Sequence, residues 1–244
     1  MEQKSAAGPG GIRQRVSQLV PLSVRRLPYQ AADRAAATRD LRRLAIARPD
    51  LVAALEGKHD DRDLRAVYDL YVNGVSNWEW AVSWPTVLVL DALCEAVRPT
   101  RILDLGSGLS TYVLCNWARR AGVEAEIVSV DTSPEWLEKT RGFLDERGLS
   151  AHLIVMDALD TLEDRSFDLA FDDIGRIEER ANVIGTVVRV MAPGGVVVLD
   201  DMNVRGYRGQ VKAKLDAARW DLFSVRAYTV DPKGRFAMLT AAPK

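Results

Sequence analysis

The chain has 244 residues, of which 48% are hydrophobic and 27% charged, and its formal net charge is −1. No stretch reaches the roughly 18 to 20 apolar residues that a membrane span needs, and no N-terminal segment has a signal-peptide core. A net charge near zero also provides no overall field that would recruit nucleic acid. We therefore expect a cytoplasmic globular protein with no membrane partner, whose cysteines Cys94 and Cys115 are buried reduced thiols.

The charge is unevenly distributed along the chain. Residues 1–48 hold ten Lys or Arg against three Asp or Glu, a balance of +7, which leaves −8 for the remainder. The interpretation we favour is that a basic N-terminal segment docks on an acidic body. An arm that binds RNA or an anionic surface, and a contact between subunits, are the alternatives that stay open.

The N-terminal part is predicted to be helical after a disordered tail. Residues 1–12 include "AAGPGG", which is typical of disorder. Residues 30–47 are rich in Ala, Leu and Arg without Gly or Pro and predict a helix, and two further helices are expected near 50–56 and 61–73. We therefore divide the chain into a tail over 1–12, a helical cap over 13–76 that would cover a site or form a homodimer, and a main domain over 77–244.

The main domain alternates short apolar runs with helical segments. A helix opened by Pro85 precedes "RILDL", and the further apolar runs "EIVSVD", "AHLIVMD", "FDLAFDD" and "VVVLDD" are separated by helix patterns, one of them capped by Ser133. This rhythm predicts an α/β fold with a mostly parallel sheet covered on both faces. At the end, "WDLFSVRAYTV", "DPKGR" and "FAMLTAA" predict a hairpin without a helix, so that the last strand is antiparallel.

Acidic residues stand at the predicted carboxyl ends of the strands, the edge where open parallel sheets bind ligands. Such acids would repel one another unless a cationic or donor-rich ligand lay among them. The residues concerned are Asp104, Asp131, Asp157, Asp172 with Asp173, and Asp200 with Asp201.

The stretch "RILDLGSGLST", residues 101–111, ends a strand in a glycine turn and opens a helix. Thr111 stands where a dinucleotide fingerprint has its third glycine, and Asp104 directly precedes the turn, whereas a pyrophosphate prefers a helix N-terminus without nearby carboxylates. A positive ligand without phosphates therefore fits this turn better than NAD.

Two acids further along are placed to hold a nucleoside. Asp131 ends the second strand, 25 positions after Gly106, where its carboxylate would accept hydrogen bonds from both hydroxyls of a ribose. Asp157 and Ala158 end the third strand, where an adenine edge would lie. The alternative for both acids is a helix cap.

Taken together, "ILDLGSG", the acid of "VSVD", "MDAL", "FDLAFDD" and "MAPGGVVVLDD" resemble the class I S-adenosylmethionine-dependent methyltransferases over about residues 77–244. Within that class the chain is similar to small O-methyltransferases of the catechol and caffeoyl-CoA type, and to a bacterial group with "GSGxST" and "LDD". The resemblance implies a Rossmann-like sheet of seven strands with an antiparallel last strand, and S-adenosylmethionine as the cofactor.

The resemblance also implies roles for individual residues. Gly106, Gly108 and Ser110 would hold the methionine part, Asp131 the ribose, and Asp157 with Ala158 the adenine, while residues 77–82, "NWEWAV", would close over the cofactor. The candidate set for the cofactor is completed by Asp104, Ser107, Thr111, Thr132, Asp172 and Trp80.

At the acceptor end, Asp173 and Asp201 align with two ligands that hold magnesium in the metal-using relatives. The third ligand there is an Asn directly after the second acid, but Met202 occupies that place and Asn203 follows, so we assign no metal ligand and leave magnesium open. Without a metal, Asp173 or Asp201 would act as general base or position a hydroxyl. His59 would be a base if the cap folds over the site, and otherwise a solvated histidine.

The function expected from the sequence is methyl transfer to a hydroxyl of a small molecule, with an aromatic compound, a sugar or a natural product as acceptor. An RNA or protein methyltransferase that uses the basic N-terminal segment is the first alternative, which the acidic body disfavours. A non-catalytic protein that binds S-adenosylmethionine is the second.

Overall fold

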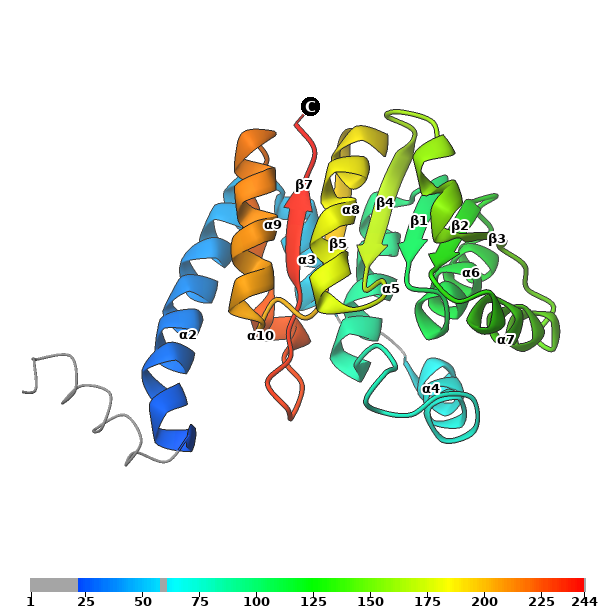
Figure 1. Ribbon diagram of the computed structural model, residues 1–244, viewed down its shortest axis with the longest axis horizontal. Helices are drawn as coiled ribbons and strands as arrows, with labels where there is room; N and C mark the ends of the chain where they lie inside the picture. Colours follow the sequence, from blue (N-terminus) through cyan, green and yellow to red (C-terminus); the bar gives the residue numbers. More distant parts are fainter. Residues whose placement is uncertain (1–21, 58–60, 244) are drawn as a thin grey trace, which may run out of the picture.

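The computed structural model describes residues 22–57 and 61–243, and within them seven strands form one sheet in the order β3-β2-β1-β4-β5-β7-β6 (Figure 1). The pairs among β1 to β5 are parallel, and β7 is antiparallel to both of its neighbours. The predicted α/β class and the antiparallel last strand are confirmed. The strands are β1 Arg101–Leu105, β2 Glu126–Asp131, β3 His152–Val155, β4 Phe167–Asp172, β5 Met191–Leu199, β6 Leu222–Ser224 and β7 Met238–Ala241.

Helices cover both faces of the sheet. In Figure 1, α8 and α9 lie in front of the sheet and α3, α5 and α6 behind it. Helix α4 lies below the carboxyl ends of β1 and β4. None of the helices in the described ranges is long and apolar enough to cross a membrane. The helices are α2 Leu22–Ala47, α3 Pro49–Glu56, α4 Arg62–Gly74, α5 Trp84–Val97, α6 Leu109–Ala121, α7 Pro134–Asp145, the 3₁₀ helix η1 Met156–Thr161, α8 Ile177–Val190, α9 Arg205–Ala217 and α10 Arg226–Thr229.

The predicted helices of the N-terminal part are present. Helix α2 is longer than expected and begins at Leu22, whereas α3 and α4 agree with the predicted ranges near 50–56 and 61–73. The predicted tail over 1–12 lies outside the described residues, and the division into cap and main domain stays a prediction.

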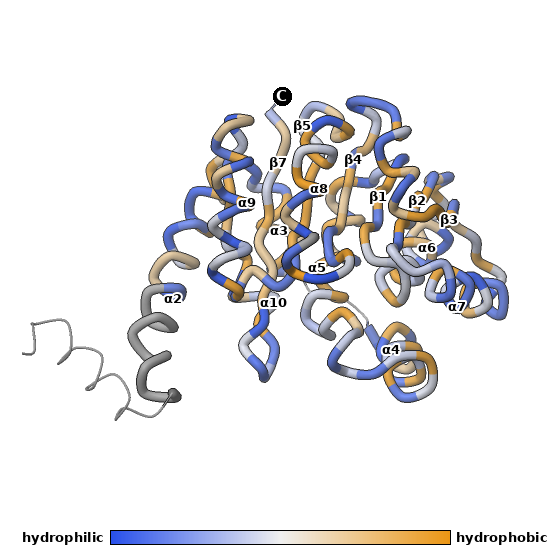
Figure 2. Tube along the Cα trace, in the orientation of Figure 1, coloured by the Kyte–Doolittle hydropathy of each residue, from blue (hydrophilic) through white to orange (hydrophobic). Residues whose placement is uncertain are grey.

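The core is built by strands whose side chains alternate between two apolar layers. Ile102 of β1 packs with the helices of the α5–α6 side, and its neighbour Leu103 packs with the α8–α9 side. The same alternation in β5 sends Val198 to the first layer and Val197 to the second, as the period of two in a strand requires. The orange central strands in Figure 2 show this apolar sheet between more polar helix surfaces. Cys94 and Cys115 are buried free thiols, as predicted.

Two predicted helix starts are confirmed. Ser83 and Ser133 have extended backbones, and their hydroxyls accept from the backbone N–H groups of Thr86 and Trp136, with a proline at the start of each helix. These caps set where α5 and α7 begin, and therefore fix the loops that precede them at the carboxyl edge of the sheet.

The hairpin predicted at the C-terminus is partly wrong. Strand β6 ends at Ser224 and the one-turn helix α10 follows, where an uninterrupted strand was expected. The reason is local: the Thr229 hydroxyl donates to the carbonyl of Val225 at 3.1 Å and accepts from the N–H of Ala237 at 3.0 Å. This side chain satisfies backbone groups that a longer β6 would have paired, so the chain leaves the sheet early.

Helix α2 covers the edge that the short β6 leaves. Asp40 accepts a hydrogen bond from the backbone N–H of Ser224 at 3.2 Å. Arg43 pairs with Asp221 and stacks over the ring of Phe223, and Leu44 is fully buried. These contacts favour the docking interpretation for the described part of the basic segment, whose residues 1–21 lie outside the described ranges.

Because α2 covers the β6 edge of the sheet, removing a buried side chain of α2 should leave a cavity there and lower the stability of the whole domain. Leu44→Ala should lower the free energy of unfolding by about 2–5 kcal/mol, and Ile46→Ala, which truncates an exposed side chain on the same helix, should change it little. Urea unfolding followed by circular dichroism measures both variants. Equal midpoints for the two variants would show that α2 does not support the sheet.

Candidate active site

A cavity of about 970 Å³ opens at the carboxyl ends of β1, β2, β4 and β5, between the sheet edge and residues of α4 and the following loop. This is the edge at which the sequence predicts ligand binding. Eight of the predicted site residues line the cavity, namely Trp80, Gly106, Ser107, Ser110, Asp131, Thr132, Asp173 and Asp201.

The glycine turn is shaped by its own packing. Gly106 and Gly108 have φ values of +107° and +149°, which disfavour other residues. A Cβ on Gly106 would come within 2.7 Å of the carbonyl oxygen of Asp173, and one on Gly108 within 2.6 Å of the Tyr71 hydroxyl. The fold therefore requires both glycines, and their presence alone does not identify a ligand.

Asp104 lies below the turn, where it holds the turn together from inside. It is fully buried, and its Oδ2 accepts from the hydroxyls of Thr111 at 2.5 Å and Ser129 at 2.8 Å. Burial raises the pKa of Asp104 to about 6, although these hydroxyls oppose the shift. Neither Asp104 nor Thr111 lines the cavity, which differs from the direct ligand contact expected for both.

Asp131 connects the turn to the end of β2 and faces the cavity. Its two carboxylate oxygens accept from the backbone N–H groups of Ser107 at 3.1 Å and Ser133 at 2.9 Å. Burial raises the pKa of this carboxyl, and the backbone hydrogen bonds oppose that effect. The side chain accepts from the backbone just before α7 and also lines the cavity, so this geometry is compatible with either predicted role, and the ribose contact stays a prediction.

Further predicted residues either do not line the cavity or lie outside the described ranges. Asp157 is exposed in η1, and the carbonyl of Ala158 accepts from the Thr161 hydroxyl at 2.7 Å within that helix. Neither residue lines the cavity. His59 lies outside the described residues. The adenine contact and the histidine base therefore stay predictions.

Two aromatic residues that the site prediction omitted enclose the turn. Trp136 donates from Nε1 to the carbonyl of Ser107 at 2.6 Å, and the Lys139 ammonium lies over its ring. Tyr71 of α4 is almost fully buried beside Gly108, and burial raises the pKa of its hydroxyl. Tyr71 belongs to an aromatic-rich stretch, but spacing alone could not distinguish a core residue from a cavity wall.

The loop between α4 and α5 forms one side of the cavity mouth. Arg235, from the loop before β7, donates to the carbonyls of Glu79 at 3.0 Å and Trp78 at 3.4 Å, and Lys233 lies over the Trp78 ring. Trp80 is 76% exposed and lines the cavity. Segments far apart in sequence therefore hold the predicted closing segment against the body.

The acidic edge contains an arginine that the sequence reading did not select. Arg180 of α8 is 5% exposed, with Nη1 at 2.7 Å from Oδ1 of Asp173 and 3.2 Å from Oδ2 of Asp201. Burial lowers the pKa of its guanidinium, but the charges of Asp173, Asp172 and Asp201 outweigh this effect and raise it. Burial and neighbouring carboxyls likewise raise the pKa of Asp173, and Arg180 opposes that shift.

Asp172 and Asp200 also lie at this edge of the sheet, but only Asp200 lines the cavity. Asp172 is fully buried, accepts from the Tyr207 hydroxyl at 3.3 Å and does not line the cavity, contrary to its expected contact with the cofactor. Burial raises its pKa to about 7. Asp200 does line the cavity, and burial together with the charge of Asp201 raises its pKa to about 6.

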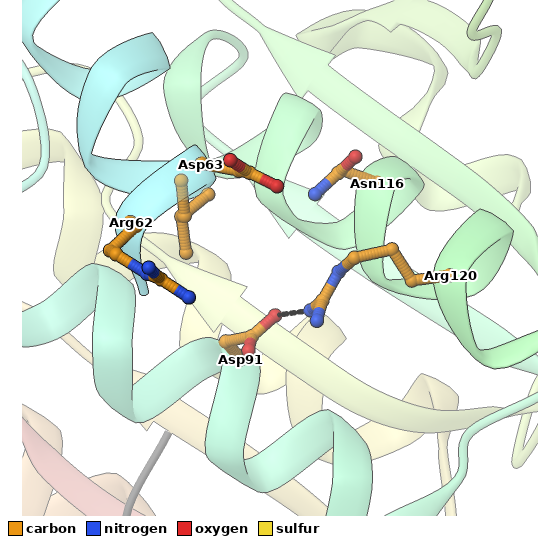
Figure 3. Close-up of a pocket in the computed structure, with 6 residues that line it drawn as sticks. Arg62, Asp63, Asp91, Asn116 and Arg120 are labelled. Atoms are coloured by element: carbon orange, nitrogen blue, oxygen red, sulfur yellow. Dashed lines mark hydrogen bonds and ion pairs between the residues drawn. The ribbon is translucent and has the colours of Figure 1, made fainter. Parts of the chain in front are cut away.

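A second, smaller cavity of about 500 Å³ lies between α4, α5 and α6. Figure 3 shows Arg120 paired with Asp91 across it, with Arg62 and Asp63 on the facing helix. Its two arginines and two aspartates balance in charge, and it lies away from the glycine turn. We assign it no function.

The sheet order and the helices on both of its faces make a Rossmann-like fold. A family model described as a methyltransferase domain matches residues 97–227, which is more than half of the 244 residues. The chain therefore belongs to this methyltransferase-domain family, and the resemblance inferred from the sequence is confirmed. No curated protein matches the chain.

Solved structures share the fold. The O-methyltransferase TomG of tomaymycin synthesis from Streptomyces achromogenes, in complex with SAM, is 20% identical with a TM-score of 0.58, covering 79% of this chain and 93% of that one. The O-methyltransferase from Bacillus cereus, in complex with SAH, is 16% identical with a TM-score of 0.56, covering 87% and 100%. A putative O-methyltransferase from Klebsiella pneumoniae is 18% identical with a TM-score of 0.56, covering 83% and 98%. At these identities the likeness establishes the fold.

Because the pKa of Asp104 is raised in the folded protein, we predict that the stability of the protein depends on pH. The carboxyl ionises near 3.8 when unfolded and about 6 when folded, so the folded state binds more protons and stability falls as the pH rises between these values. A shift of this size corresponds to about 3 kcal/mol in the free energy of unfolding. Asp104→Asn, which cannot ionise, should flatten the fall in stability between pH 4 and pH 8.

Ser129→Ala should change the pH dependence of stability in the opposite direction to Asp104→Asn. It removes a hydroxyl that stabilises the carboxylate, so it should destabilise the protein more at pH 8 than at pH 5. Urea unfolding at each pH measures both effects, and parallel pH profiles for the wild type and Asp104→Asn would contradict the assignment.

Proposed function

We propose that this methyltransferase binds S-adenosylmethionine at the glycine turn and transfers its methyl group to a hydroxyl of a small molecule. The observation that carries the proposal is that Asp131 and the turn of Gly106 and Ser107 line one wall of the large cavity, while Asp173, Asp200 and Asp201 line another. The volume of about 970 Å³ is at the upper end of the roughly 300–1,000 Å³ usual for small-ligand sites, which suits a cofactor and an acceptor together.

The residues present fit this cofactor. Asp131 offers carboxylate oxygens to the ribose hydroxyls, and the buried Ser107 Oγ has no hydrogen-bond partner among the described residues. Trp136 offers an apolar surface beside them. Within the cavity the acids exceed the cations, which favours a positively charged ligand over one with a pyrophosphate. S-adenosylmethionine, when bound, supplies an electrophilic methyl group on a sulfonium.

The chain's own part in the reaction is to orient the acceptor and remove its proton. Asp200 and Asp201 adjoin each other on the cavity wall, and Asp201 holds a strained φ of +54°. With a pKa of about 6, Asp200 is mostly ionised at neutral pH and well matched to accept a proton from a hydroxyl. We assign proton removal to Asp200, whose pKa is raised by burial and by the charge of Asp201.

A small acceptor is supported over a macromolecule by the form of the site. Residues of the loop 76–82 line the cavity, and Arg235 holds this loop through two backbone carbonyls. The described part of the basic segment that an RNA or protein methyltransferase would use, residues 22–48, packs on the domain through Asp40, Arg43 and Leu44, and residues 1–21 lie outside the described ranges. No described contact favours that alternative.

The cofactor is tested by calorimetric titration with S-adenosylhomocysteine, with NADH titrated in parallel. Asp131→Ala should weaken binding of S-adenosylhomocysteine on the order of 100-fold, because two hydrogen bonds to a charged group are lost. Asp145→Ala, an exposed acid at the end of α7, is the matched control and should bind like the wild type. Binding of NADH alone would overturn the proposal.

Turnover is tested by a screen of hydroxylated aromatic compounds and sugars with methyl-labelled S-adenosylmethionine. Once an acceptor is identified, kcat/KM should rise with pH through about 6 as Asp200 ionises. Asp200→Asn should lower kcat at least tenfold while the affinity for S-adenosylhomocysteine stays unchanged. An unchanged kcat in that variant would exclude Asp200 as the base, and binding without turnover of any acceptor would favour a non-catalytic binder.

A further inference from the structure

Arg180 fills the place between the two acids that align with metal ligands in the catechol-type relatives. Its guanidinium lies 2.7 Å from Asp173 and 3.2 Å from Asp201 through the same nitrogen, Nη1. Nε donates to the carbonyl of Ile174 at 3.0 Å and Nη2 to that of Gly175 at 3.3 Å. Four oxygen atoms from four residues therefore surround one buried cation that belongs to the chain itself.

A divalent metal does not fit this arrangement. Magnesium takes oxygen ligands at about 2.0–2.1 Å, and the acid oxygens that would supply them are engaged by Arg180. Met202, at the position of the relatives' third ligand, is fully buried in the apolar layer of α8 and α9 and provides no oxygen. Within the described residues, no three acids, histidines or cysteines gather as a metal site would require.

We propose that Arg180 is a built-in replacement for the divalent metal: it neutralises Asp173 and Asp201 and binds the acceptor oxygen, so that this methyltransferase needs no metal ion. The inference rests on the proposed function, because the acceptor must enter the cavity that Arg180 lines. A guanidinium has five N–H donors. Three of them donate to Asp201 and to the carbonyls of Ile174 and Gly175, and Nη1 also forms an ion pair with Asp173. The second N–H of Nη2 has no acceptor among the described residues, and it is the donor that the proposal assigns to an oxygen in the cavity.

The position of Arg180 explains how it can replace an ion. It lies in the first turn of α8, close to the helix N-terminus, and the guanidinium is held by carbonyls from the loop that connects β4 to α8. A fixed planar cation can position an oxygen as a metal does. The N–H groups of Arg180 are largely occupied by Asp201, Ile174 and Gly175, so the fork is not free to bind two acceptor oxygens. The substrate class that follows is an acceptor recognised by one oxygen, with no requirement for a catechol pair.

The test is binding of Mn²⁺, followed by the electron paramagnetic resonance signal of the free ion. The wild type should leave the signal at the free-ion amplitude, with or without S-adenosylhomocysteine. Arg180→Ala vacates a site surrounded by oxygens and should bind Mn²⁺ at least tenfold more tightly than the wild type. Adding Asp173→Asn to the Arg180→Ala variant should return its affinity for Mn²⁺ to that of the wild type.

Arg189→Ala is the matched control, because it removes the same charge from the other end of α8 and should behave like the wild type. Circular dichroism and the affinity for S-adenosylhomocysteine establish that each variant is folded. If Arg180→Ala does not fold, Arg180→Gln keeps more of the side-chain volume without the charge and should bind Mn²⁺ in its place.

The outcomes separate the two proposals. The proposal that Arg180 replaces a metal would be overturned if the wild type bound one Mn²⁺ per chain and Asp173→Asn lost that binding. It would also be overturned if Arg180→Ala folded but did not bind Mn²⁺. Neither result depends on the cofactor. Absence of S-adenosylhomocysteine binding in the wild type would instead refute the proposed function, and the Mn²⁺ signal does not report on it.

Discussion

The convergence of carboxylates at one edge of the sheet is the constraint on which the rest of the site depends. Parallel strands end side by side, so acids that are far apart in sequence come together there, and each buried charge must be compensated. The fold meets this requirement differently at each strand. Asp104 accepts hydrogen bonds from two hydroxyls, and Asp131 accepts them from two backbone N–H groups. Asp172 accepts a hydrogen bond from a tyrosine, and Asp173 and Asp201 form ion pairs with a guanidinium.

These solutions divide the edge into two chemically different halves. Near β1 and β2 the acids are satisfied by neutral donors, which order the glycine turn and leave a negative field where a sulfonium would lie. Near β4 and β5 the guanidinium of Arg180 lies among the acids, and burial together with the charge of Asp201 raises the pKa of Asp200. The proposed division of the cavity into a cofactor half and an acceptor half rests on this arrangement of charge.

Contacts between distant segments complete the cavity. Tyr71 reaches the glycine turn from α4, and Arg235 reaches the loop of residues 76–82 from the region before β7. Helix α2 closes the opposite edge of the sheet at β6. The helical part before α5 therefore shares the core of the domain through Leu44, Leu51 and Tyr71, and the site wall depends on that shared packing.

The sequence by itself determined the elements whose causes are local. Short apolar runs separated by helix patterns predicted the parallel sheet and its helices, Pro85 and the Ser133 cap predicted two helix starts, and the acids that end the strands predicted the edge that holds the site. Asp131, Asp173 and Asp201 were found in this way, because a strand end is visible in sequence. The short helix α10 was not predicted, since the Thr229 hydroxyl gains its partners only when Ala237 folds back.

Only the tertiary structure decided which side chains meet. Arg180 sits in a helix with the polar appearance of a solvated face, and nothing in its spacing shows that the first turn of α8 points between two strand ends. Likewise, sequence could not show that Asp104 and Asp172 lie beneath the cavity while Asp200 lines it. The rotation of a helix about its axis and the depth at which a side chain is buried depend on packing against elements that are far away in the sequence. A local sequence pattern therefore cannot predict them.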